Sequence, residues 1–148
     1  DTQALSQADG AITLKLGNGL TKGLGAGANP DVGRKAAESD RAAIEELLSG
    51  ADMIFITAGM GGGTGTGAAP IIAKMAKDLD ILTVGIVTMP FQFEGRMRIE
   101  QSQKGIEKLR NVVDSLIVIN NNKLREVYGN LGFKAGFSKA DEVLSIKM

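Results

Sequence analysis

The chain has 148 residues, enough for one domain with a modest core, and it contains no cysteine and no histidine. These absences exclude disulfides, thiol nucleophiles, Ser-His-Asp triads and ordinary zinc sites. Lysine plus arginine and aspartate plus glutamate both number 17, so the net charge is zero and no basic surface for nucleic acid is expected. No apolar run approaches the roughly 20 residues that span a bilayer. No signal peptide opens the chain, so a cytosolic protein is expected.

The first third of the chain predicts a strand, a glycine loop and a helix. Residues 11–16 alternate apolar and polar side chains, which predicts a half-exposed strand. Gly23-Leu-Gly-Ala-Gly27 is a glycine loop, and Asn29 and Pro30 after it suit the N-cap and the first residue of a helix. This helix is expected to continue unbroken to about Ser49-Gly50. Its apolar side would consist of Val32, Ala36, Ala37, Ile44, Leu47 and Leu48.

The centre of the chain predicts a strand, a second glycine loop and a second helix. Met53–Thr57 is a short apolar run that predicts a buried strand. Six of the ten residues from Ala58 to Gly67 are glycine, and a helix is expected from about Ala68, with Pro70 near its first turn. This order favours an anion site, because glycine lets backbone N–H groups approach a phosphate and the helix dipole attracts negative charge. The alternative is a structural turn or a flexible linker.

The rest of the chain continues to alternate strands and helices. Residues 81–88 form a near-continuous apolar run, which predicts an interior parallel strand. The elements expected after it are a loop at 91–95, a helix at 96–111, a strand at 115–119, a short helix at 123–128, a loop at 129–136 and a last helix from Phe137. Such alternation predicts an α/β, Rossmann-like fold with a mainly parallel sheet and flanking helices. A ligand would bind at the carboxyl edge of that sheet.

Two common phosphate-binding motifs fit the glycine loops poorly. No Gly-Lys-Ser or Gly-Lys-Thr occurs in the chain, which excludes an ordinary Walker A loop. Gly63, Gly65 and Ala68 formally meet the dinucleotide fingerprint. The following strand, however, ends in Thr88-Met89-Pro90 and lacks the acid that would bind a ribose. A NAD-binding Rossmann protein is therefore a less favoured alternative.

Several motifs in order resemble the FtsZ family, the bacterial tubulin homologues of cell division. Gly61-Gly-Gly-Thr-Gly-Thr-Gly67 is similar to the tubulin-type signature loop, and residues 25–30 resemble the γ-phosphate loop of the family. Residues 90–96 are similar to its sugar-edge segment, and residues 137–144 to the start of its long central helix. The resemblance covers about residues 1–144 and implies a tubulin/FtsZ GTPase domain.

The resemblance implies a site for GTP or GDP, with Mg²⁺ accompanying the nucleotide. The residues it assigns to the phosphates are Gly25, Ala26, Gly27, Gly61, Gly62, Gly63, Thr64, Gly65, Thr66 and Gly67. Glu94 and Arg98 would contact the ribose region. Asn121, Phe137 and Asp141 would bind guanine, with the register inside Asn120–Asn122 left open by one residue. A carboxylate accepts the N–H donors of guanine, which adenine does not present. No catalytic residue and no metal ligand is assigned to the chain.

The resemblance also implies that the chain is truncated at both ends. In the family, a strand and a further glycine-rich loop precede the position of Asp1, and the central helix leads to an acidic loop that enters the next subunit's site. The chain is therefore expected to be a partial GTP-binding domain without these parts and without the C-terminal domain. It should leave apolar faces of the sheet open, bind GTP weakly and be unable to hydrolyse GTP unaided.

The function implied is that of the GTP-binding portion of a cell-division GTPase, which polymerises head to tail into the septal ring and hydrolyses GTP at the subunit interface. Its partners would be further copies and other division proteins. Its location would be the cytoplasm at the mid-cell division site, with neither nucleic acid nor direct membrane insertion involved. An alternative from another class is a non-catalytic module that caps filaments through one polymer face.

Overall fold

The computed structural model describes Leu5 and residues 8–128, which form a three-stranded sheet with helices packed against it. The predicted loop at 129–136 and the helix from Phe137 lie outside the described residues. In chain order the elements are α2 (Asn18–Thr21), α3 (Pro30–Ser39), α4 (Arg41–Leu48), β1 (Met53–Gly59), α5 (Gly63–Asp78), β2 (Leu82–Met89), the 3-10 helix η1 (Gln92–Glu94), α6 (Arg96–Arg110), β3 (Ser115–Asn120) and α7 (Asn121–Tyr128). In this part of the chain, no helix is both long and apolar enough to cross a membrane.

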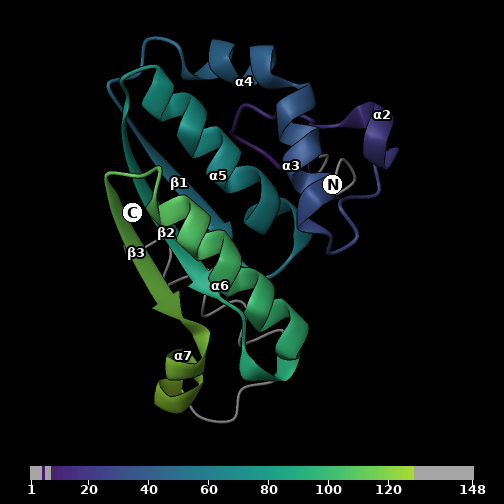
Figure 1. Cartoon of the computed structure of the whole chain (residues 1–148), viewed down its shortest axis with the longest axis vertical. Coiled ribbons are helices and arrows are strands. Elements are labelled where there is room, and N and C mark those ends of the chain that lie inside the picture. Colours follow the sequence, from purple (N-terminus) through teal and green to yellow (C-terminus); the bar gives the residue numbers. More distant parts are fainter. Residues whose placement is uncertain (1–4, 6–7, 129–148) are drawn as a thin grey trace.

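The three strands are parallel and lie in chain order, β1-β2-β3. The long helices α5 and α6 make the two crossovers and lie on the same face of the sheet (Figure 1). Right-handed crossovers between strands in sequential order place their helices on one side, which explains this arrangement. The predicted α/β fold with a parallel sheet is confirmed, as are the strands at 81–88 and 115–119 and the helix at 96–111.

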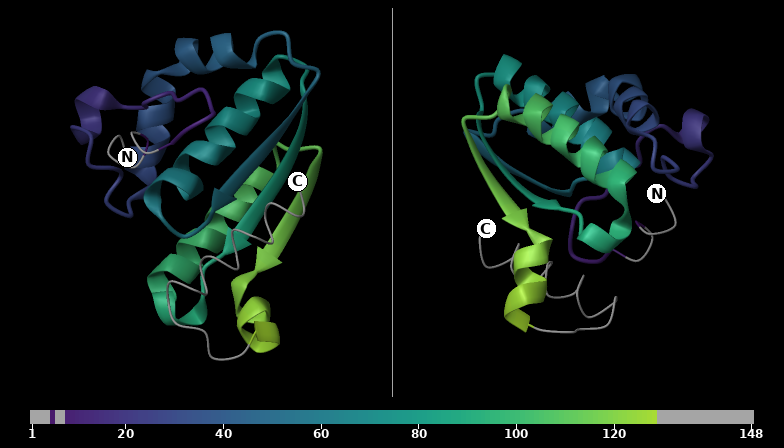
Figure 2. Two further views of the ribbon diagram at one scale, coloured as in Figure 1. Left: turned by 180° about the vertical axis from the view of Figure 1, so that it is seen from behind. Right: turned by 60° about the horizontal axis from the view of Figure 1, so that its bottom comes forward.

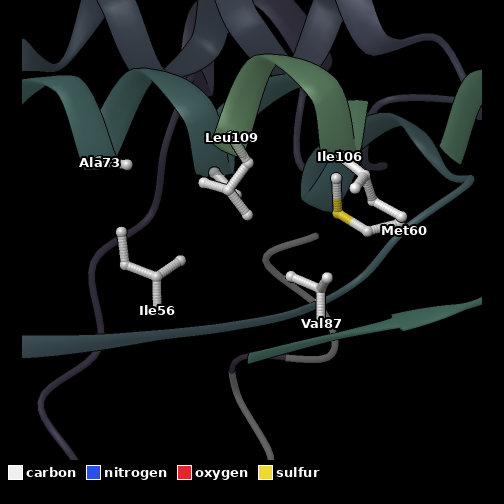
Figure 3. Packing of buried hydrophobic residues seen from close by; sticks show 7 residues of the cluster. Ile56, Met60, Ala73, Val87, Ile106 and Leu109 are labelled. Carbon is white, nitrogen blue, oxygen red and sulfur yellow. The ribbon is translucent and has the colours of Figure 1, made fainter. Parts of the chain in front are cut away.

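The main core fills the space between the sheet and these two helices. Ile56 of β1 and Val87 of β2 point toward α5 and α6, where Ala73, Ile106 and Leu109 meet them (Figure 3). Ala73 and Leu109 have no exposed surface at all. The small alanine lets α5 approach the sheet closely, and the larger leucine fills the space below α6.

The opposite face of the sheet is open along β1 and at the start of β2, whereas Ile86, further along β2 on this face, is fully buried. Met53 and Phe55 of β1 are 43% and 47% exposed, and Leu82 of β2 is 47% exposed. The prediction of β1 as a buried strand is therefore wrong for one face, since only Ile56 of this strand is classed as buried. A parallel strand is buried on both sides only where helices cover both faces. In the described ranges α5 and α6 cover one face (Figure 2).

The segment at residues 11–16 does not form the predicted strand. Leu14 and Leu16 are partly buried and pack against a second apolar cluster that contains Ala37 and Ile44, whereas Ile12 is 84% exposed. The alternation thus reflects an extended segment with one side turned inward. A strand also requires a neighbouring strand for its backbone hydrogen bonds, and within the described residues none pairs with this segment.

The helix expected from Pro30 to about Ser49-Gly50 is in fact two helices that meet at Asp40. This residue has φ −110° and ψ 28°, outside the helical range. Its Oδ2 accepts a hydrogen bond of 2.6 Å from the backbone N–H of Gly17. The break changes the helix direction, so the helical spacing no longer places Leu47 on the buried side, and Leu47 is 51% exposed. A contact distant in the sequence therefore ends α3.

Helix α5 begins inside the glycine run, at Gly63, and not at Ala68 as predicted. Pro70 consequently lies within the helix and not in its first turn. The early start depends on close packing against α3. A Cβ on Gly67 would overlap the carbonyl oxygen of Pro30, so only glycine fits at this crossing. Glycines that the sequence suggests as a loose loop therefore serve partly as a helix–helix contact.

Candidate functional site

The candidate site lies at the carboxyl edge of the sheet. The register pairs Gly59 with Thr88, and Met89 with Asn120, so the three strands end side by side. Three segments start from this edge: the turn before α5, the loop with η1 before α6, and the beginning of α7. Ligands of parallel α/β sheets bind at such an edge. The residues predicted for the site on these segments therefore share one region of the molecule.

The turn between β1 and α5 consists of only Met60, Gly61 and Gly62. Gly61 has φ +108°, which favours glycine, and a Cβ on it would lie 3.0 Å from the carbonyl oxygen of Arg98. The Thr66 Oγ1 accepts a hydrogen bond of 2.8 Å from the Gly61 N–H. Thr66 is 5% exposed, so this hydroxyl is used to hold the turn and does not face solvent. Thr64, two residues earlier on the helix, is exposed.

The N-terminus of α5 has the features of an anion site. Its N-cap, Gly62, makes no side-chain capping bond, so within the described ranges the first N–H groups of the helix have no side-chain cap. Helix α3 differs, because the Asn29 Oδ1 accepts a hydrogen bond of 3.0 Å from the Asp31 N–H. The predicted N-cap at Asn29 is confirmed. Of the two helix starts that follow a glycine loop, α5 is therefore the one that lacks a side-chain cap.

The first glycine loop lies directly against the start of α5. A Cβ on Gly63 would come 2.5 Å from the Ala26 Cβ, and Gly25 and Gly27 have φ values of 94° and 58°. A hollow of about 220 Å³ opens beside this contact, and its lining consists of Leu5, Leu14, Leu16, Thr21, Gly25, Ala26 and Thr64. The structure thus brings both predicted phosphate loops together, although strand β1 and two helices separate them in the sequence.

Glu94 and Arg98 reach the same edge from the segment after β2. The Glu94 Oε2 accepts a hydrogen bond of 2.6 Å from the Phe91 N–H, so one carboxylate oxygen stabilises its own turn. Arg98 lies in the first turn of α6, and its Nη1 is 3.8 Å from the position that a Cβ on Gly62 would take. The guanidinium group therefore borders the turn before α5. Among residues 8–128, Arg98 forms no ion pair.

The three consecutive asparagines after β3 differ in their hydrogen bonds. The Asn120 Oδ1 accepts a bond of 2.9 Å from the Asn122 N–H, and the Asn122 Oδ1 accepts one of 2.8 Å from the Gln92 N–H. Asn121 is 3% exposed, and its Oδ1 has no hydrogen-bond partner among the described residues. A buried acceptor without a partner costs about 1–3 kcal/mol. Asn121 is therefore the asparagine whose side-chain oxygen the described chain leaves unused.

Two predicted base-binding residues, Phe137 and Asp141, lie outside the described residues. The short helix predicted from Lys123 begins two residues earlier, at Asn121, so Asn121 is the first residue of α7. In the ranges that the structure describes, no three acidic side chains lie close enough together to hold a metal ion.

Gln101 on α6 is a residue of this region that the sequence did not single out. Its Nε2 donates hydrogen bonds to the carbonyl oxygens of Gly61, at 3.0 Å, and Ala28, at 3.3 Å. No motif marks a glutamine in the middle of a polar helix. Only the packing of α6 across both glycine loops reveals these contacts.

Comparisons with known proteins agree with this fold. The family model described as "Tubulin/FtsZ family, GTPase domain" matches residues 1–129. The chain is 58% identical over 146 residues to the cell division protein FtsZ of Pseudomonas aeruginosa. This match covers 98% of this chain and 37% of that relative. The chain therefore spans little more than a third of the length of the curated relatives that it matches.

Solved structures give the same result. An FtsZ point mutant from M. jannaschii superposes with a TM-score of 0.95 at 44% identity and covers 97% of this chain and 43% of that one. A structure titled "FtsZ dimer, empty", also from M. jannaschii, has a TM-score of 0.85 at 46% identity and covers 87% of this chain and 38% of that one. These matches confirm the resemblance seen in the sequence. The chain belongs to the Tubulin/FtsZ family, in the part of it that is described as the GTPase domain.

Proposed function

We propose that this chain is the GTP-binding portion of a filament-forming GTPase of cell division. The observation that carries the proposal is the contact between the two glycine loops, where Ala26 lies against Gly63 at the N-terminus of α5. Two loops with close backbone approach, beside a helix start without a side-chain cap, suit a ligand with several linked phosphates. The family match and the absence of a Walker lysine support a tubulin-type site over a P-loop.

In this proposal the phosphates lie at the start of α5. The backbone N–H groups around Gly62–Gly65 donate to the α- and β-phosphates, and the exposed Thr64 hydroxyl adds a further donor. The Gly25–Gly27 loop faces the γ-phosphate. Arg98 supplies a positive charge beside the turn and can donate to oxygens of the phosphates or the ribose. The helix dipole contributes about 0.3–1 kcal/mol toward an anion at this end.

Guanine would be recognised at the end of β3. The Asn121 Oδ1, buried and without a partner among the described residues, would accept one of the N–H donors of guanine. Adenine presents no N1–H donor, so this contact favours GTP over ATP. The Glu94 Oε2 already accepts a hydrogen bond from the Phe91 N–H. The other carboxylate oxygen of Glu94 would accept a hydrogen bond from a ribose hydroxyl. Phe137 and Asp141 would complete the base site by stacking and by accepting from guanine.

Mg²⁺ would enter with the nucleotide. No acidic cluster suited to a metal occurs in the described ranges, so the ion would be held mainly by phosphate oxygens and water. Magnesium bound in this way neutralises part of the charge that the linked phosphates bring to the site.

Hydrolysis and filament formation belong, in this proposal, to a longer protein. The chain covers 37% of its FtsZ relative, and we assign it no catalytic residue. We expect the isolated chain to turn over no GTP. The longer protein would assemble head to tail with further copies and act with other division proteins in the cytoplasm at mid-cell. The M. jannaschii relative whose title describes a dimer supports self-association in this family.

Titration calorimetry of the purified chain with six ligands tests the proposed function. We expect GTP and GDP to bind more tightly than GMP and guanosine, and ATP and NAD to bind at least about tenfold more weakly than GTP, the factor that one lost polar contact produces. Equal affinity for ATP and GTP would refute the assignment of guanine. A preference for NAD would favour the dinucleotide-binding alternative, and measurable GTP turnover would contradict the expected inactivity.

A further inference from the structure

We infer that Gln101 is a positioning residue that orients the two glycine loops toward each other and thereby sets the preference of the site for a linked di- or triphosphate. The inference rests on the proposed nucleotide site, and it concerns a residue of α6 that does not itself contact the ligand. Its basis is the pair of hydrogen bonds from the Gln101 Nε2 to the Gly61 and Ala28 carbonyl oxygens.

A side-chain amide is well suited to this role. Its NH₂ group has two donors and can serve two carbonyl oxygens at once. Here the carbonyls belong to different loops, because Ala28 follows the first glycine loop and Gly61 precedes α5. Among the described residues, no other side chain donates hydrogen bonds to both loops. Gln101 is thus a direct polar bridge between them.

The peptide that Gln101 holds is one that can rotate easily. It joins Gly61 to Gly62, and a peptide between two glycines changes orientation with little steric resistance. In a trans peptide the C=O and the N–H point in opposite directions. With the Gly61 oxygen bound to Gln101, the Gly62 N–H points away from α6. A rotated peptide would instead present a carbonyl oxygen at the start of α5 and would repel a phosphate.

Helix α6 is a firm support for this bridge. Ile106 is 6% exposed and Leu109 is fully buried in the main core (Figure 3). One turn after Gln101, Gly105 packs against Thr66, since a Cβ on Gly105 would lie only 2.6 Å from the Thr66 Cγ2. Thr66 in turn holds the Gly61 N–H. Both sides of Gly61 are therefore fixed: its N–H by Thr66, which packs on α6 at Gly105, and its C=O by Gln101 on the same helix.

Three substitutions at Gln101 separate positioning from simple packing. Gln101→Met keeps the length of the side chain and removes the donors. Gln101→Glu keeps the shape of the side chain but places a carboxylate, which has no donor, beside the two carbonyl oxygens. Gln101→Lys restores donors on a chain of similar reach. The matched control is Gln103→Met, because Gln103 is exposed and lies two residues further along the same helix.

The first readout is the ratio of guanosine to GTP dissociation constants, measured by calorimetry. We expect Gln101→Met to lower GTP affinity by about 3–10-fold while guanosine affinity stays within about twofold of wild type. The loss of GTP affinity should be larger in Gln101→Glu and much smaller in Gln101→Lys. Gln103→Met should bind GTP as tightly as wild type. An equal loss for GTP and guanosine with a lower Tm would overturn the inference, because it would show a structural role alone.

The second readout needs no nucleotide. Hydrogen exchange of the unliganded protein should speed up about 3–10-fold at backbone amides of residues 60–63 and 26–29 in Gln101→Met, and remain at the wild-type rate in Gln103→Met. If wild type binds no GTP, the proposed function fails, whereas faster exchange still supports the bridge. Wild-type exchange rates in both loops of Gln101→Met would overturn the inference whatever the nucleotide affinity.

Discussion

The hydroxyl oxygen of Thr66 accepts a hydrogen bond of 2.8 Å from the backbone N–H of Gly61, so the first turn of α5 holds the turn that leads into it. Both ends of this bond are shielded from solvent, since both residues are classed as buried. The bond fixes Gly61 in a conformation with φ +108°. The turn before α5 is therefore organised by the chain itself, before any ligand arrives.

Thr66→Val should destabilise the protein by about 1–3 kcal/mol, because valine has nearly the same shape but leaves the buried Gly61 N–H without an acceptor. Thr66→Ser retains the hydroxyl and should lose clearly less stability than Thr66→Val. Urea denaturation followed by circular dichroism measures both. A Thr66→Val protein as stable as wild type would show that this hydrogen bond does not hold the turn.

Gly67→Ala should separate α3 from α5. The added Cβ would overlap the Pro30 carbonyl oxygen and lie 2.8 Å from the Arg34 backbone nitrogen, and neither backbone atom can move easily. We expect a loss of about 1–3 kcal/mol or more. Gly19→Ala is the matched control, because a Cβ there meets nothing within 4 Å. Thermal melts that show the same shift for both variants would contradict this packing.

Asn121→Leu should leave the stability of the unliganded protein unchanged or slightly higher. The substitution removes a buried Oδ1 that lacks a partner in the described part of the chain. In the same variant GTP affinity should fall about tenfold, since the proposed guanine acceptor is lost. Asn122→Leu should behave in the opposite way and destabilise the protein, because the Asn122 Oδ1 accepts from the Gln92 N–H. Melting temperature and nucleotide titration together distinguish the two asparagines.

Asp40→Ala should destabilise the protein by about 1–3 kcal/mol through loss of the acceptor for the Gly17 N–H. Its helical signal should not fall, because alanine at the break allows α3 and α4 to join. Glu46→Ala on the exposed side of α4 is the control and should stay within about 0.5 kcal/mol. Far-ultraviolet circular dichroism and urea melts give both quantities, and a helical loss in Asp40→Ala would contradict the account of the break.

Features decided by neighbouring residues were predictable. Asn29 and Pro30 mark the start of α3, and the apolar run at residues 81–88 marks the central strand β2. In each case the signal comes from side chains within about one helical turn or from the period of a strand. The order of motifs along the chain also sufficed to identify the family, which the matches to FtsZ proteins confirm.

Features decided by distant partners were not predictable. The surroundings of Asn121 and Gln101 in the candidate site show this most clearly. The sequence assigned base binding to Asn121 but left the register open by one residue, and the hydrogen bonds that Asn120 and Asn122 accept distinguish these two from Asn121. Gln101 acquires its contacts because α6 packs across two loops that lie far from it in the chain.

The sequence by itself determined the strand–helix order, the parallel sheet, the glycine loops and the family, because these follow from local periodicity and from motifs. The tertiary structure decided that α3 ends at Asp40, that α5 begins at Gly63 and that residues 11–16 form no strand. Each of these outcomes depends on a partner brought close by folding: the Gly17 N–H, the Pro30 carbonyl oxygen, or a neighbouring strand that the described residues do not supply. Local pattern shows what a segment can form, and long-range hydrogen bonds and packing select where it starts and stops.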